Sequence, residues 1–235
     1  MHEDRGKGYF DEQDYRRGTG AAARGLSGVF ALMFLGLLAS AVSALFTLSS
    51  PFMFNLVFGS QAGLVFAFLP LLVVMLVFPR VWHMSPGAAF TVFFVYALLN
   101  GVGLSVIFLM YDLGTIALAF FSAAGMFGVM AVYGRVTRAD LSGMGSMLFM
   151  GLIGIVIASV LNWFFANDTL DMFISYAGIA IFLGLTAYDV QRIKRSMIEH
   201  GGRAPAAVMV MGALHLYLDF LNIFLFLLRL LGRRR

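Results

Sequence analysis

The stretch between Arg24 and Arg80 limits the fold most, because it contains no charged residue at all. About 20 apolar residues cross a bilayer as a helix, so residues 25–79 are long enough for two crossings. Turn-forming residues at positions 49–51 (SSP) and 59–61 (GSQ) supply a break between them. Only 12% of all residues are charged, against about a quarter in soluble domains. We therefore expect an all-α integral membrane protein.

Hydropathy along the rest of the chain predicts seven transmembrane helices in a single domain, residues 25–235, preceded by a mobile, mixed-charge tail, residues 1–24. The expected spans are residues 26–48, 56–78, 86–110, 113–133, 142–165, 172–188 and 206–231. The last span is complete only if Asp219 is tolerated within it.

Basic residues predict the orientation of the spans. Lys and Arg gather in the tail and after the second, fourth and sixth spans, whereas the other loops carry none. Because cytoplasmic loops are rich in Lys and Arg, we expect a cytoplasmic N-terminus in a multi-pass protein. Arg233, Arg234 and Arg235 then lie outside, against the rule, unless the last segment re-enters and returns.

The composition also excludes several classes of site. The chain has no cysteine, which removes disulfides and thiolate metal sites. The formal charge of +4 comes from basic residues at the ends of apolar runs, so it indicates topology rather than nucleic-acid binding. We expect no tightly bound cofactor, and the lipid bilayer as the principal partner.

Two acids interrupt apolar runs and are the strongest candidates for a functional site. Asp189 ends the sixth span in GLTAYDVQRIK, and Asp219 lies within the seventh. Both are equally far from residue 204 along the chain, so an antiparallel helix pair would bring them to similar depth. Intramembrane acids are costly and mark function by default. Two adjacent carboxylates cannot both ionise freely and would titrate as one unit. The alternative is that each acid is neutralised separately by a basic neighbour.

Such a pair suggests a proton-controlled cation path. A shared proton would hold the two acids in a closed contact, and its loss would leave two anions that a divalent cation such as Ca²⁺ can bridge transiently. His215 lies one turn before Asp219 on the same face, and Asn222 follows three residues later. We expect both to line the same cavity; a hydrogen-bonded packing role is the alternative for His215.

Small residues and one serine also need an interpretation. Gly125, Gly128, Gly143, Gly145, Gly151 and Gly154 are expected to let helices approach closely. Residues 25–28 (GLSG) resemble part of a nucleophile motif, with His83 or His215 as a base. The serine, however, follows Arg24 at the start of the first span, where a cap or a close contact explains it better. We do not expect an enzyme.

Four segments in order resemble the Bax inhibitor-1 family, also called the transmembrane BAX inhibitor motif family, in its bacterial branch. They are residues 101–111 (GVGLSVIFLMY), 133–142 (YGRVTRADLS), 182–194 (FLGLTAYDVQRIK) and 214–228 (LHLYLDFLNIFLFLL). The resemblance extends from about Arg24 to the end of the chain.

The resemblance implies a bacterial inner-membrane protein whose last helix is surrounded by the other six. It also implies a pH-sensitive calcium leak, with Ca²⁺ as the permeant ion, gated by aspartates that match Asp189 and Asp219. Family members latch this pair with an arginine on the second helix; here that helix offers none before Arg80 at its end, so the latch falls to Arg80, Arg24 or a residue of the sixth loop. Some bacterial relatives instead modulate membrane-bound AAA proteases, for which the tail would be the handle.

Overall fold

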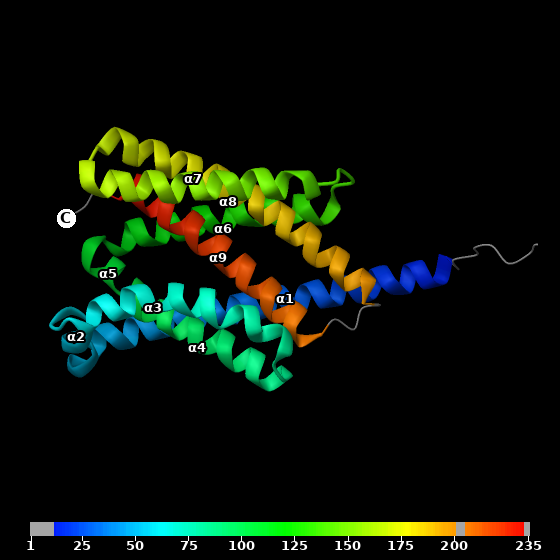
Figure 1. Ribbon diagram of the computed structural model, residues 1–235, viewed down its shortest axis with the longest axis horizontal. Helices are drawn as coiled ribbons and strands as arrows, with labels where there is room; N and C mark the ends of the chain where they lie inside the picture. Colours follow the sequence, from blue (N-terminus) through cyan, green and yellow to red (C-terminus); the bar gives the residue numbers. More distant parts are fainter. Residues whose placement is uncertain (1–11, 201–204, 233–235) are drawn as a thin grey trace, which may run out of the picture.

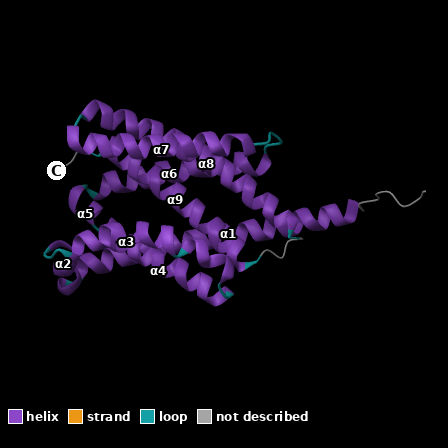
Figure 2. Ribbon diagram, viewed as in Figure 1, coloured by secondary structure: helices purple, strands orange, loops and turns teal. Residues whose placement is uncertain are grey.

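The computed structural model describes residues 12–200 and 205–232, and every element within these ranges is a helix (Figures 1 and 2). The elements in chain order are α1 (Glu12–Ser49), α2 (Pro51–Phe58), α3 (Ala62–Leu76), the 3₁₀ helix η1 (Phe78–His83), α4 (Pro86–Leu104), α5 (Val106–Met110), α6 (Leu113–Val136), α7 (Ser142–Phe165), α8 (Asp168–Glu199) and α9 (Ala206–Leu231).

Six of these helical segments are long and apolar enough to cross a membrane. They match six of the seven expected spans, and α4 with α5 forms one of them, Pro86–Met110. The expected second span, residues 56–78, is instead divided. α2 begins at Pro51 with Ser50 as its cap, and the chain turns at residues 59–61 before α3. An early proline suits a helix start, so this segment breaks where the sequence indicated but begins sooner. The count of seven spans stays a prediction.

Two helices are longer than the hydropathy predicted. α1 already includes residues 12–24, which we had assigned to a mobile tail, although its apolar part begins at Ala23. Residues 1–11, the first part of the expected protease handle, lie outside the described residues. α8 continues past Tyr188 to Glu199, because basic residues leave the apolar layer without ending a helix. Asp189 therefore lies inside a continuous helix and not at its end.

α9 crosses the middle of the molecule (Figure 1) and is the most buried span: 67% of its apolar stretch is buried, compared with 6% for α7. It packs against α1, α4, α6, α8 and η1. The complete ring of six helices that we expected around it is not confirmed, because the main partner of α7 is α8 and that of α3 is α4.

The crossing of α1 and α4 shows how the bundle is held together. A Cβ atom at Gly101 would overlap the carbonyl oxygen of Ser40 and would lie 2.8 Å from Cβ of Ser43. The Ser40 hydroxyl contacts the Ala97 carbonyl at 2.7 Å, and the Ser43 hydroxyl donates to the Leu98 carbonyl at 2.8 Å. Helices in lipid are usually held together by small residues that let their backbones touch and by hydroxyl groups that hydrogen-bond from one helix to the next.

The glycines singled out from the sequence divide into two groups. Gly145 lies against the ring of Tyr188, and Gly151 lies against Ile181, so both permit the close approach of α7 to α8. At Gly125, Gly128, Gly143 and Gly154 an added Cβ would meet no atom within 4 Å. The packing interpretation is therefore wrong for those four, and Gly101 and Gly134 make the tighter contacts.

This contrast gives a stability prediction. Gly101→Ala should destabilise the protein by about 1–3 kcal/mol, because the added methyl meets backbone that cannot move aside. Gly125→Ala is the matched control and should be neutral or slightly stabilising, since alanine is the better helix former. Thermal unfolding in detergent measures both. Equal melting temperatures for the two variants would contradict the close contact at Gly101.

Candidate functional site

The two acids predicted from the sequence meet between α8 and α9. These helices are antiparallel neighbours with the most extensive contact in the fold, and both acids lie on the sides that face each other. The Asp189 carboxyl is within hydrogen-bonding reach of the Asp219 carboxyl. Asp189 is 7% exposed and Asp219 is 4% exposed. The equal spacing of the two residues from the α8–α9 link therefore did bring them to the same depth.

The burial of Asp219 leaves one oxygen atom without a donor. Its Oδ2 is completely enclosed and has no hydrogen-bond partner among the described residues. A buried polar atom without a partner costs about 1–3 kcal/mol. A single proton placed on the pair would supply the missing donor, because a protonated carboxyl donates while an ionised one only accepts. The geometry thus suits a pair that carries one proton.

The pair lines a cavity of about 540 Å³ that is bounded by α7, α8 and α9. The polar or ionisable side chains on its wall are Tyr188, Asp189, Arg192, His215, Asp219 and Asn222. The lining residues that come from α7 are Gly145, Phe149, Leu152 and Val156. α7 therefore adds no titratable group to the cavity. His215 and Asn222 therefore lie where the helical spacing placed them. The Asn222 amide donates to the Leu218 carbonyl at 2.8 Å.

Arg192 is the basic residue that the sequence reasoning did not single out for this site. It lines the cavity together with His215, and its positive charge acts on the Asp189 carboxyl. The sequence does indicate this placement, because Arg192 follows Asp189 by three residues and residues three apart share one face of a helix. We had interpreted Arg192 mainly as a topological anchor.

The two arginines named individually as latch candidates lie elsewhere. Arg80 is on η1, is exposed, and donates to the carbonyl of Leu76. Arg24 is exposed on α1. Neither is among the residues that line the acid cavity. The remaining alternative was a basic residue after the sixth expected span. Arg192 is one of these residues, and it lines the cavity together with the acid pair.

The α6–α7 loop is fixed to α8 immediately beyond Asp189. The Gln191 side chain donates to the Ala139 carbonyl at 2.8 Å and accepts from the Leu141 amide at 2.9 Å. The Lys194 ammonium donates to the Arg135 carbonyl at 2.8 Å. A glutamine that satisfies two backbone groups of a loop replaces the bonds that a helix or strand would have given them.

Asp140 completes this attachment. It accepts hydrogen bonds from the Ser142 hydroxyl at 2.7 Å and the Ser142 amide at 3.0 Å, and it pairs with Arg195 at 3.0 Å. These bonds, those from Ser142 before that from Arg195, lower the pKa of Asp140 to about 2. The N-cap position of α7 belongs to Leu141, which has no side-chain cap bond, so Asp140 is not the cap and acts by bonding Ser142, the first residue of the helix.

The attachment has a predicted pH dependence. Because the pKa of Asp140 in the folded protein lies below its ordinary value of 3.8, its contribution to stability is complete above that value and is lost as the pH falls towards 2. The difference in melting temperature between the wild type and Asp140→Asn should therefore shrink between about pH 5 and pH 2. In an Arg195→Gln background the same trend should persist, because the Ser142 bonds remain. A difference that stays constant over this range would contradict the assignment.

Comparison with known proteins agrees with this architecture. A family model described as "Inhibitor of apoptosis-promoting Bax1" matches residues 23–235. The inner membrane protein YbhL of Escherichia coli is 40% identical over 213 residues, which cover 88% of this chain and 90% of that protein. A protein of Borreliella burgdorferi is 42% identical over 222 residues (89% and 92% covered), and one of Caulobacter vibrioides is 36% identical over 219 residues (88% of each).

Fold and site together define an all-helical membrane protein with two acids in contact inside the bundle. The matches to nearly the whole chain assign it further: the protein belongs to the Bax inhibitor-1 family.

Proposed function

We propose that the protein is a pH-sensitive cation leak channel or transporter, with Ca²⁺ as the permeant ion, controlled by protonation of Asp189 and Asp219. The observation that carries this proposal is the contact of the two carboxyls on the wall of a cavity within the bundle. Packing alone does not require an acid within a membrane-spanning helix, because apolar residues would fill the same space at a lower cost in free energy.

Two protonation states give two arrangements of the site. With one proton shared, the carboxyls bond to each other and hold α8 against α9. Without it, two negative charges face each other in a poorly hydrated space and repel. Repulsion separates the helices, and the charges then attract a cation into the cavity. Flux is therefore expected to rise with pH.

The ligands available favour passage of calcium over storage. Ca²⁺ takes 6–8 oxygen ligands, and the pair offers two carboxylates with Asn222 nearby. No group of three or more His, Cys, Asp or Glu side chains suited to a metal occurs among the described residues. Water must then complete the coordination shell, and such a site binds weakly enough to release the ion.

Arg192 is our candidate for the arginine that acts on the acid pair, as a residue that tunes the loss of its proton and not as a latch that holds it closed. It lies three residues from Asp189 on α8, and its charge acts on that carboxyl. A cation here stabilises the ionised form of Asp189, so it sets the pH at which the pair loses its proton. Arg80 and Arg24, on η1 and α1, have no comparable position.

We also propose that α3, continued by η1, is a seventh crossing and that the N-terminus is cytoplasmic. The apolar helix Phe68–His83 is shorter than the other six spans. Support comes from the course of the chain: α1 begins and α9 ends at opposite ends of the molecule (Figure 1), as an odd number of crossings requires. The α6–α7 loop and the C-terminal part of α8, which carry basic residues, lie at the end where α1 begins (Figure 1), as expected for a cytoplasmic side.

Calcium flux in reconstituted vesicles tests the acid gate. With a calcium dye inside the vesicles, wild-type flux should increase several-fold, roughly threefold or more, from about pH 6 to about pH 8. Asp189→Asn and Asp219→Asn should each give low flux without this dependence, because an amide and a carboxyl can bond at any pH in that range.

Glu199→Gln is the matched control, since it removes an exposed acid from the same helix as Asp189. It should behave as the wild type. Identical pH-dependent flux in the wild type and both aspartate variants would rule out this pair as the gate.

Replacement of Arg192 should move the pH response without removing it. In Arg192→Gln the rise in flux should shift upward by about half a pH unit to one unit, because an exposed arginine acts on the pair through partly screened attraction. Lys194→Gln removes a charge of the same sign at the same end of α8, but its ammonium bonds to the Arg135 carbonyl. An equal shift in both variants would indicate a general surface potential and not a specific effect of Arg192.

A further inference from the structure

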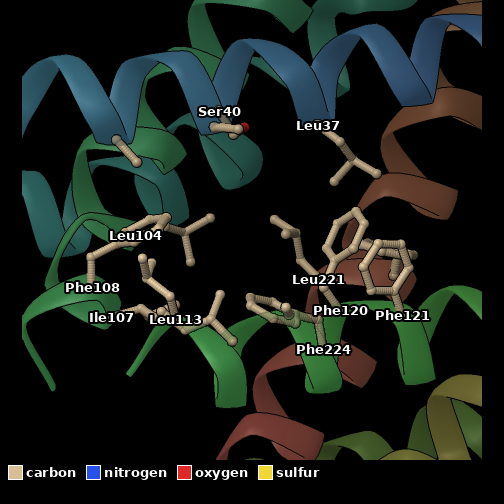
Figure 3. Close-up of a pocket in the computed structure, with 15 residues that line it drawn as sticks. Leu37, Ser40, Leu104, Ile107, Phe108, Leu113, Phe120, Phe121, Leu221 and Phe224 are labelled. Carbon is tan, nitrogen blue, oxygen red and sulfur yellow. The ribbon is translucent and has the colours of Figure 1, made fainter. Parts of the chain in front are cut away.

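A second cavity lies on the other side of α9 and is almost wholly apolar. Its volume is about 400 Å³, and its walls come from α1, the end of α4, α5, α6 and α9 (Figure 3). α9 contributes Phe220, Leu221 and Phe224. At 3.6 residues per turn, these residues face away from Asp219 and His215. The two cavities are therefore separated by α9 itself.

Ser40 is the one polar side chain on the wall of this cavity. Its hydroxyl is already engaged, at 2.7 Å from the Tyr217 hydroxyl, 2.7 Å from the Ala97 carbonyl and 3.0 Å from the Gly36 carbonyl. Water needs two to four polar partners to remain in a cavity. The wall offers no such set, so hydrated ligands, ions and lipid headgroups do not suit the interior.

An apolar space of this size is not stable when empty in a bilayer. Even a cavity of about 150 Å³ lined by Leu, Ile and Phe takes up benzene, because the lining atoms otherwise lose their dispersion contacts. The wall here is continuous with the lipid-facing surface: Leu113 and Phe121 line it and are 71% and 72% exposed. Acyl chains therefore have direct access to the cavity from the side.

We propose that this cavity is a lateral binding site for one acyl chain of a membrane phospholipid. The cavity lies towards the end of the molecule that carries α5, so the lipid belongs to the leaflet opposite the one in which α1 begins (Figure 1). The bound chain packs on Phe220, Phe224 and Phe120, and the headgroup stays outside. It contacts α9 on the face opposite the acid pair, beside the ring contacts that Phe120 of α6 makes with Phe220 and Phe224.

Space-filling substitutions test the site without any assay of flux. Ala41 and Ala117 line the cavity and are exposed, so Ala41→Phe and Ala117→Phe should occupy it without disturbing the core. Native mass spectrometry of protein released from nanodiscs of dioleoyl phosphatidylglycerol should show one retained lipid on the wild type. Its occupancy should fall at least about tenfold in either variant. Ala180→Phe, on the exposed surface of α8, is the matched control and should retain the lipid.

A measurement on the wild-type chain covers the case in which the variants do not fold. Crystals grown from a lipidic mesophase doped with phospholipid brominated on one chain should give anomalous bromine density between Phe108, Phe120 and Phe224. Equal lipid retention in all four proteins, no retained lipid on the wild type, or bromine density only outside the cavity would each overturn the proposal.

Discussion

The contact between two carboxyls across the α8–α9 interface is the interaction on which the arrangement of this protein depends. Placing even one ionised acid at membrane depth costs about 2.5–3.5 kcal/mol on insertion scales. Here Asp189 and Asp219 are both nearly enclosed, and one oxygen of Asp219 has no donor in the part of the chain that the structure describes. A proton removes both difficulties together. A pair that carries one proton is therefore less strained than a pair that carries none.

Neighbouring segments hold both halves of this contact in place. α8 is fixed by α6, where Gly134 lies against the backbone of Ala187, and by the α6–α7 loop, whose backbone bonds to Gln191. α9 is enclosed by several helices at once. The acids therefore belong to two well-supported elements, and the energy of their repulsion is not lost in the local fraying of a helix end.

Much of this arrangement could be predicted from the sequence, because lipid imposes simple rules. The charge-free stretch from residue 25 to residue 79 required membrane crossings, and the equal spacing of Asp189 and Asp219 from the α8–α9 link predicted their meeting. Helix ends were less predictable: hydropathy reports where lipid ends, whereas α8 continues to Glu199 into water. The roles of individual glycines and of Arg192 depend on which helix faces each residue. The pattern of residues along the sequence does not show these helix contacts.

The weak burial of α7 determines which helix would move if the acid cavity were to widen. α9 has polar groups of the acid cavity on one side and an apolar cavity on the other, so turning it about its axis would carry a carboxyl towards hydrocarbon. Rotation of α9 is therefore the most expensive movement available. α7 forms one wall of the same cavity, exposes most of its surface to lipid and packs chiefly on α8. Movement of α7 relative to α9 would therefore be the least costly way for the bundle to widen.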